Sequence, residues 1–267
     1  MQPCWLSVDE RTDLGALPAD ATPGLDGGEE AARAEAESLQ GLLAELQERL
    51  YAEAQRSVLL VLQSMDAGGK DGAVRKVFAG VSPQGVRVTG FRAPTSDERA
   101  RDFLWRVHQV VPAAGQIGVF VRSHYEDVVA VRVRGLADEA VWRPRYAHIR
   151  AFEALLHDRG TRIVKCFLHI DRDEQKERLL KRLRNPAKHW KFDPGDLDDR
   201  ARWDEYMRAY RDAIVQTDCP HAPWHVIPAN RKWFRDLALL RIVVAALQDM
   251  DPRYPPPRFD PDAIRID

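Results

Sequence analysis

Residues 63–72 read Gln63-Ser64-Met65-Asp66-Ala67-Gly68-Gly69-Lys70-Asp71-Gly72. The stretch follows an apolar run over residues 57–63, whose length suits a strand buried on both faces, and it opens a helical segment. In such a place glycines let successive backbone N–H groups converge on an anion, and the helix N-terminus adds partial positive charge. A lysine after the turn reaches terminal phosphates. The context predicts a phosphate-binding loop; an ordinary glycine-rich turn is the alternative.

Individual residues of this loop have different expected roles. We expect phosphate to be bound by Ser64, Ala67, Gly68, Gly69, Lys70, Asp71 and Gly72. The match to G-x-x-x-x-G-K-[ST] is imperfect, because Ser64 replaces the first glycine and Asp71 replaces the hydroxyl residue. A carboxylate in an anion site is repelled by phosphate unless a divalent cation lies between them, so Asp66 is a candidate Mg²⁺ ligand. A turn-capping role is the alternative for Asp66.

Strand and helix signals alternate along the rest of the chain. Strands are predicted over residues 86–91, 117–121, 163–170 and 224–227. Helical patterns occupy residues 29–55, 74–79, 97–110, 146–157, 173–184, 198–216 and 232–248. This alternation predicts βαβ units, and hence a mostly parallel sheet with helices on both faces. We predict one α/β domain over residues 29–250, preceded by an irregular arm (1–28) and followed by a proline-rich tail (251–267).

The residues after the third predicted strand form a second candidate site. The chain continues as Arg122-Ser123-His124-Tyr125-Glu126-Asp127 at the carboxyl end of that strand, which is the edge where open parallel sheets bind ligands. Arg122 suits bidentate binding of a phosphate. The alternative is an ion pair of Arg122 with Glu126 or Asp127. His124 is a weak candidate and is expected to be a satisfied histidine rather than a general base.

A basic insert is the third candidate. Residues 178–191 contain no acidic residue and carry six cations, Arg178, Lys181, Arg182, Arg184, Lys188 and Lys191. A helix and loop of this charge can close over a polyanion and stabilise charge on a transferring phosphoryl group. The alternative is a solvated basic face.

The overall composition restricts the classes of function. The chain has 40 Lys and Arg against 41 Asp and Glu, which argues against a nucleic-acid-binding protein with a global basic field. No apolar run reaches the roughly 18 to 20 residues that a membrane span requires. The three cysteines are far apart and form no C-x-x-C pair, so we expect reduced thiols and a cytoplasmic protein.

Together these motifs resemble the polyphosphate kinase 2 family, from about residue 46 to residue 251. The resemblance rests on residues 62–72, 103–106, 120–128, 174–179, 185–192 and 229–233. The run Arg122 to Asp127 is most similar to the subgroup that phosphorylates nucleoside monophosphates as well as diphosphates. The resemblance implies a three-layer α/β/α phosphate-loop kinase fold, with a parallel five-stranded sheet and a helical lid over about residues 173–200.

The resemblance also implies a reaction and a set of site residues. The reaction is reversible, Mg²⁺-dependent phosphoryl transfer between inorganic polyphosphate and AMP, ADP or ATP, which makes ATP regeneration a role for the chain. Carried onto matching positions, the catalytic residues are Asp66, Lys70, Arg122, Arg178 and Arg182, with Mg²⁺ at Asp66. Lys188 and Lys191 join Arg178 and Arg182 in the lid as phosphate-binding residues. We also expect a homo-oligomer, for which the exposed face of the helix over 29–55 offers a surface.

Two positions depart from the family pattern. Val121 stands where the family has Asp or Asn, so a polar group expected near the metal is replaced by one that cannot ligate Mg²⁺. Ser64 replaces a position that is usually glycine, a milder change because serine is small. Two other functions compete with polyphosphate-dependent transfer: a nucleotide kinase with a nucleoside triphosphate donor, and a non-catalytic protein that binds polyphosphate or nucleotide.

Overall fold

Five parallel strands form the centre of the molecule in a computed structural model that describes residues 3–266. The sheet order is β2-β3-β1-β4-β5. The strands are β1 Ser57–Gln63, β2 Val86–Gly90, β3 Ile117–Val121, β4 Thr161–His169 and β5 Trp224–Pro228. All residues of β1 are buried, whereas the edge strand β2 is partly exposed, as its place in the order requires. The predicted parallel sheet is therefore confirmed.

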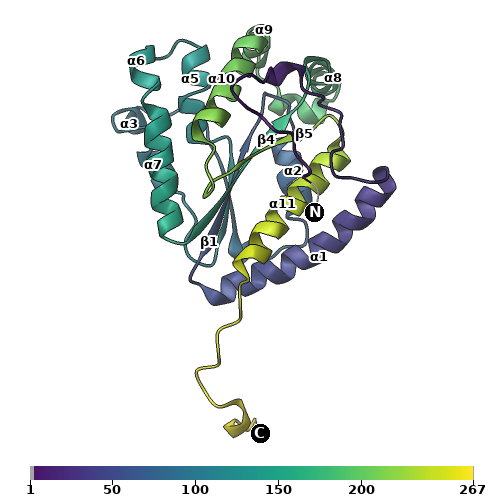
Figure 1. Cartoon of the computed structure of the whole chain (residues 1–267), viewed down its shortest axis with the longest axis vertical. Helices are drawn as coiled ribbons and strands as arrows, with labels where there is room; N and C mark the ends of the chain where they lie inside the picture. The colour runs from purple at the N-terminus through teal and green to yellow at the C-terminus, as the bar shows by residue number, and fades with distance from the viewer. Residues whose placement is uncertain (1–2, 267) are drawn as a thin grey trace.

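Helices cover both faces of this sheet. The helices are α1 Glu29–Glu53, α2 Lys70–Val77, α3 Ser96–Arg99, α4 Trp105–His108, α5 Ala130–Val133, α6 Glu139–Trp142, α7 Arg145–Asp158, α8 Arg172–Leu183, α9 Gly195–Ala201, α10 Trp203–Thr217 and α11 Lys232–Met250. Helices α7 and α10 lie on one face, and α2 and α11 lie on the other, with α1 packed against α11 (Figure 1). This is the three-layer α/β/α arrangement expected from the sequence.

The apolar periodicity of α1 explains its position. Leu43, Leu46 and Leu50 are buried on one face of this helix and belong to the hydrophobic core. The helix ends at Ala54, which has a left-handed backbone and donates its N–H to Leu50 O. None of the helices within residues 3–266 is both long and apolar enough to cross a membrane.

The segment between β2 and β3 differs from its prediction. One helix was expected over residues 97–110, and that expectation is wrong: the segment holds α3 and α4 with a turn between them. Thr95 and Glu98 form a capping box that starts α3. The Asp102 carboxylate then accepts from Leu104 N, and its carbonyl accepts from Trp105 N, which interrupts the helix.

The arm and the tail flank the domain on different sides. The arm is irregular, apart from the 3₁₀ turn Leu14–Ala16, and it is pinned to the domain by a bridge between Leu6 and Val226 and by burial of Leu14. The tail leaves the lower end of α11 in Figure 1 and extends away from the body. Residues 1–2 of the expected arm and residue 267 of the expected tail lie outside the described residues.

A buried ion pair lies beneath the turn that follows β3. Lys165 of β4 and Glu153 of α7 are both fully buried, and Lys165 Nζ donates to Glu153 Oε2 at 2.7 Å. The same ammonium donates to Tyr125 OH at 3.0 Å and to Thr217 O at 2.8 Å. Tyr125 OH in turn contacts Glu153 Oε1 at 2.7 Å. The pair therefore fixes the 3₁₀ turn His124–Asp127, which carries Tyr125, against the core.

Loss of one partner should leave the other as an uncompensated buried charge. We predict that Lys165→Met lowers the free energy of unfolding by about 3–5 kcal/mol. Lys165→Met combined with Glu153→Leu should lose distinctly less, because no charge is then buried alone. Urea unfolding of both variants measures the difference. A double variant that is no more stable than Lys165→Met would show that burial of an unpaired charge is not the cause.

Candidate active site

The loop between β1 and α2 has a backbone that limits which residues it accepts. Ala67 and Gly69 have positive φ angles of 61° and 95°. A Cβ atom on Gly69 would lie 2.3 Å from Arg235 Nη1, and one on Gly68 would lie 2.2 Å from Ser64 Oγ. Glycine at these two positions lets the loop close tightly around the N-terminus of α2. The predicted order of strand, glycine loop and helix is thereby confirmed.

Lys70 opens α2 and turns its side chain back across the loop. Its Nζ donates to Ser64 O and Ser64 Oγ, each at 2.8 Å, and lies 3.4 Å from Met65 O. Burial, followed by the charge of Arg122, lowers the pKa of Lys70 to about 8. The Lys70 ammonium therefore lies within the loop, and its pKa depends on the charges around it.

Asp66 and Arg122 meet at the carboxyl edge of the sheet. Parallel pairing of Leu62 with Val121 places the ends of β1 and β3 side by side. Arg122 Nη2 donates to Asp66 Oδ1 at 2.5 Å. Burial alone would raise the pKa of the Asp66 carboxyl, but the charges of Lys70 and Arg122 outweigh it and hold this pKa below its ordinary value. Asp66 is thus a carboxylate at neutral pH.

The backbone of Arg122 is strained. Its φ is 63°, a left-handed conformation that costs a non-glycine residue roughly 1–2 kcal/mol. Its N–H donates to Leu62 O at 3.0 Å, which continues the pairing with β1. Such conformations gather at functional sites, where the surrounding structure enforces them. Here the turn held by Lys165 and Glu153 begins two residues after Arg122.

Glu126 is a site residue that the sequence offered only as a counter-ion for Arg122. Burial raises the pKa of the Glu126 carboxyl, although the charges of Arg122 and Lys70 act against this. With the Gln63 amide oriented to satisfy both of its ends, Gln63 Nε2 donates to Glu126 Oε1 at 3.0 Å and its oxygen accepts from Ser123 N at 3.1 Å. The signal in the sequence was its place four residues after Arg122, in the run that follows the carboxyl end of β3.

Two arginines support the loop from outside. Arg178 of α8 donates to Gly68 O at 2.9 Å and to Ala67 O at 3.2 Å, and its other nitrogen donates to Ala229 O at 2.6 Å. Arg235 Nη1 donates to Gly69 O at 3.3 Å. These contacts place Arg178 against the backbone of the loop rather than on the surface of the lid. Its expected direct contact with a polyanion therefore stays a prediction.

The remaining basic residues lie on the insert formed by α8, the 3₁₀ turn Pro186–Lys191 and α9. Lys191 Nζ pairs with Asp71 Oδ2 at 3.0 Å, which ties the insert to the first turn of α2, where Gly72 also lies. Arg182 Nη1 donates to Lys191 O at 3.1 Å and to Asp196 Oδ2 at 3.2 Å. Lys188 is exposed on the turn. The insert therefore borders the loop, as the lid prediction requires.

Acidic oxygens are also present at the mouth of the site, where the insert borders the phosphate loop. Burial, together with the charge of Asp66, raises the pKa of Asp196 to about 6. Within residues 3–266 no three His, Cys, Asp or Glu side chains are arranged to hold a metal ion by themselves. Val121, beside Arg122, offers no ligand. Mg²⁺ is usually held by one or two carboxylates together with substrate phosphates, so Asp66 fits such a partial ligand set.

Comparison with known proteins agrees with this geometry. A family model described as Polyphosphate kinase 2 (PPK2) matches residues 27–255. The chain is 51% identical over 97% of its length, and 97% of the relative, to the AMP/ADP-polyphosphate phosphotransferase of Meiothermus ruber. It is 41% identical over 92% of its length, and 89% of the relative, to the ADP-polyphosphate phosphotransferase of Rhodopseudomonas palustris.

Two solved structures of polyphosphate kinase 2 proteins are similar to this chain. The crystal structure of polyphosphate kinase 2 from Arthrobacter aurescens TC1 matches with a TM-score of 0.92 at 45% identity, over 97% of this chain and 93% of that one. A putative polyphosphate kinase 2 from Pseudomonas aeruginosa PA01 matches with a TM-score of 0.82 at 33% identity, over 88% of this chain and 50% of that one.

The lowered pKa of Lys70 makes anion binding dependent on pH. Below about pH 8 the Lys70 ammonium is already charged in the free protein. Above that pH Lys70 must take up a proton when the anion binds, which weakens binding. We predict that the affinity for sulfate, a dianion that does not titrate here, falls as pH rises through about 8 and approaches a decrease of about tenfold per pH unit. Calorimetric titrations between pH 6.5 and 9.5, roughly centred on that pKa, measure this dependence.

Lys70→Met is the control for this titration. The variant should bind sulfate weakly, with an affinity that changes little across the same range, since the titrating group is gone. An equally steep pH dependence in Lys70→Met would assign the effect to another group.

Proposed function

The chain belongs to the polyphosphate kinase 2 family, and on this premise we propose that it transfers phosphoryl groups from inorganic polyphosphate to AMP and ADP. The observation that carries the proposal is the convergence of Lys70, Arg122 and Asp66 at one edge of the sheet, beside a basic insert. The product of the second transfer is ATP, so ATP regeneration is the role that follows.

The residues of the loop are arranged to hold a phosphate chain. The backbone N–H groups around Gly68 and Gly69 lie at the N-terminus of α2, where an anion is stabilised by the partial positive charge of the helix. Lys70 contributes a full charge at the same place. Its present partners, Ser64 O and Ser64 Oγ, are neutral. The ammonium can exchange them for a charged phosphate oxygen, to which its hydrogen bond is stronger.

Arg122 contributes a planar guanidinium on the opposite side of the mouth. It is partly buried, and its ion pair with Asp66 keeps the guanidinium oriented. A guanidinium held in this way binds two oxygens of one phosphate without further ordering of its side chain. We assign to Arg122 and Lys70 the alignment of the donor and acceptor phosphates.

Mg²⁺ is the cofactor that the donor set fits. Asp66 would hold it together with phosphate oxygens, and Ser64 Oγ lies in the same loop as a further oxygen. When bound, the ion neutralises phosphate charge and so favours approach of the two anionic substrates.

The insert provides the remaining cations. Arg182 and Lys191 are each paired with a carboxylate, Asp196 and Asp71 respectively, at the mouth of the loop. A polyanion that enters the mouth competes for these two cations. Phosphoryl transfer requires little covalent chemistry from the protein, so alignment and charge stabilisation by these side chains account for catalysis.

Removal of Lys70 tests the assignment directly. With Mg²⁺, polyphosphate and either AMP or ADP, Lys70→Ala should form ADP or ATP at least about 10²- to 10³-fold more slowly than the wild type, because one preorganised charge is lost. Chromatography of the nucleotides measures the rate. Lys76→Ala, which removes an exposed lysine from the same helix, is the matched control and should retain full activity.

The same assay separates the donors. Polyphosphate should support formation of ADP and ATP, and an added nucleoside triphosphate should not replace it. If only the nucleoside triphosphate donates, the protein is a nucleotide kinase of another specificity; if neither donates while polyphosphate binds tightly, it is a binding protein.

Val121 offers a second test at the end of β3. An amide at this position places a polar group beside Arg122 and Asp66, where Mg²⁺ or its water needs a partner. We predict that Val121→Asn lowers the Mg²⁺ concentration required for half-maximal rate. Val121→Leu, which keeps the position apolar, should leave that concentration unchanged. If both variants behave like the wild type, the site does not use position 121 for the metal.

A further inference from the structure

The C-terminal tail ends in a segment, residues 255–266, that forms no hydrogen bond or ion pair with the rest of the described chain. After Asp251, whose left-handed backbone ends α11, the chain carries Pro252 and the run Pro255–Pro257. Within the described residues, all hydrogen bonds made by residues 255–266 are internal to the tail. Prolines favour an extended, semi-rigid conformation with a rise of about 3.1 Å per residue. The run therefore holds the segment beyond it away from the body, as Figure 1 shows.

The segment beyond the prolines carries exposed apolar side chains and charges of both signs. Phe259 is 62% exposed and Ile264 is 55% exposed. Between them the Asp260 carboxylate accepts from Asp262 N at 3.1 Å and caps the short 3₁₀ turn Pro261–Ala263. Residues 259–264 thus form a Phe-Asp-Pro-Asp-Ala-Ile segment with two carboxylates, and Arg258 and Arg265 flank it on either side. Exposed large apolar side chains on an ordered segment are typical of an interaction site.

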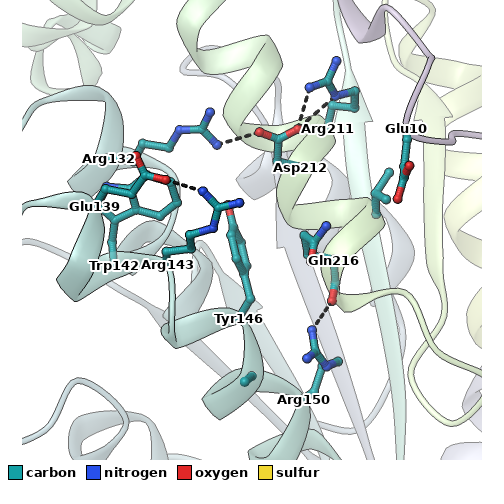
Figure 2. A pocket seen from close by; sticks show the side chains of 12 residues that line it. Glu10, Arg132, Glu139, Trp142, Arg143, Tyr146, Arg150, Arg211, Asp212 and Gln216 are labelled. Atoms are coloured by element: carbon teal, nitrogen blue, oxygen red, sulfur yellow. Dashed lines mark hydrogen bonds and ion pairs between the residues drawn. The ribbon is translucent and has the colours of Figure 1, made fainter.

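A cavity in the domain is lined by arginines and aromatic side chains, together with the carboxylates of Glu10, Glu139 and Asp212. It lies between α6 and α7 on one side and α10 on the other, and its volume is about 610 Å³. Trp142, Tyr146 and Val215 give it apolar surface. Figure 2 shows Arg143 and Arg150 reaching over it from the α7 side and Arg211 from α10.

The two rim arginines are available to a carboxylate. The Arg143 side chain is 72% exposed and, among the described residues, pairs with Glu139, whose side chain is 59% exposed. Arg150 donates to the backbone carbonyl of Gln216, a neutral acceptor, at 2.6 Å. A carboxylate would replace or add to these contacts with a charge-assisted pair. The cavity therefore suits an aromatic side chain with acidic neighbours.

We propose that residues 259–264 of one copy of this chain dock in the cavity between α7 and α10 of a second copy. Phe259 lies against Trp142 and Tyr146, and Asp260 and Asp262 face Arg143 and Arg150. Each copy carries both the segment and the cavity, so two copies can exchange tails and satisfy both contacts in a closed pair. The proline run favours docking in a second copy over docking in the same chain, since it directs residues 259–264 away from their own domain.

A photocross-link tests the contact in the full-length protein. Phe259 is replaced by the photoreactive p-benzoylphenylalanine, and this protein is mixed with wild-type chain labelled with ¹⁵N. Irradiation should join the tail of one isotopic form to α6, α7 or α10 of the other, and mass spectrometry of the linked peptides identifies the copies. Cross-links confined to one copy, cross-links to other elements, or no cross-links would overturn the proposal.

Charge-reversal variants test whether the tail carboxylates pair with the cavity arginines. Asp260→Arg with Asp262→Arg in the tail, or Arg143→Glu with Arg150→Glu in the cavity, should each reduce the intermolecular cross-link by at least about tenfold, because like charges then meet. A mixture of the two variants should restore it, since the reversed tail of one matches the reversed cavity of the other. Arg159→Glu, which reverses an exposed arginine at the C-terminal end of α7 outside the cavity, is the control and should have no effect. Failure of the mixture to restore the link would rule out the exchange.

This test is independent of the catalytic assignment. The cross-link is measured without nucleotide or polyphosphate, and the substituted residues lie on the tail and on α6–α7 rather than at the phosphate loop. A protein that cross-links as expected but does not transfer phosphate would leave the tail proposal intact and reject the proposed function.

Discussion

Parallel pairing of β1 with β3 is the constraint on which the site depends. It places Leu62 beside Val121, so the next residues of the two strands, the phosphate loop and Arg122, leave the sheet at the same edge. The contact between Asp66 and Arg122 is possible only because of this pairing, since the two residues are 56 positions apart in the chain. The site is therefore a property of strand order as much as of the loop.

The phosphate loop and the start of the turn after β3 both have strained backbones, and each is held by residues that lie outside the mouth. Ala67 and Arg122 have left-handed backbones. Arg178 holds the carbonyls of the loop from α8, while the buried Lys165 and Glu153 hold the turn after Arg122 from β4 and α7. Strain at a functional site persists only where the surrounding structure enforces it, and these buried charges supply that enforcement. The same contacts preorganise the cations, so that binding requires little further ordering.

Charge balance at the mouth explains how a chain of near-zero net charge can bind a polyanion. Lys191 and Arg182 are paired with Asp71 and Asp196, so these two cations of the insert are neutralised locally, and a bound anion would replace the carboxylates. Burial, followed by the nearby charge of Asp66, raises the pKa of Asp196, so these two carboxylates crowd each other at the mouth. A divalent cation held at Asp66, as proposed above, would relieve that crowding and would link metal and substrate binding through the same few side chains.

The sequence by itself determined the local parts of this protein: the phosphate loop, the alternation that specifies a parallel sheet, and the basic character of residues 178–191. These follow from short-range chemistry, since glycine spacing, apolar runs and charge are read directly along the chain. Only the tertiary structure decided that Arg178 supports the loop from behind, that Glu126 joins Lys70 and Arg122, and that residues 97–110 form two helices. Each of these depends on contacts with residues that are distant in sequence, or on a turn whose side-chain hydrogen bonds override helical periodicity. The charges along residues 178–191 predicted a basic insert, but the direction of the Arg178 guanidinium is fixed by the carbonyls of Gly68 and Ala229, which lie outside α8.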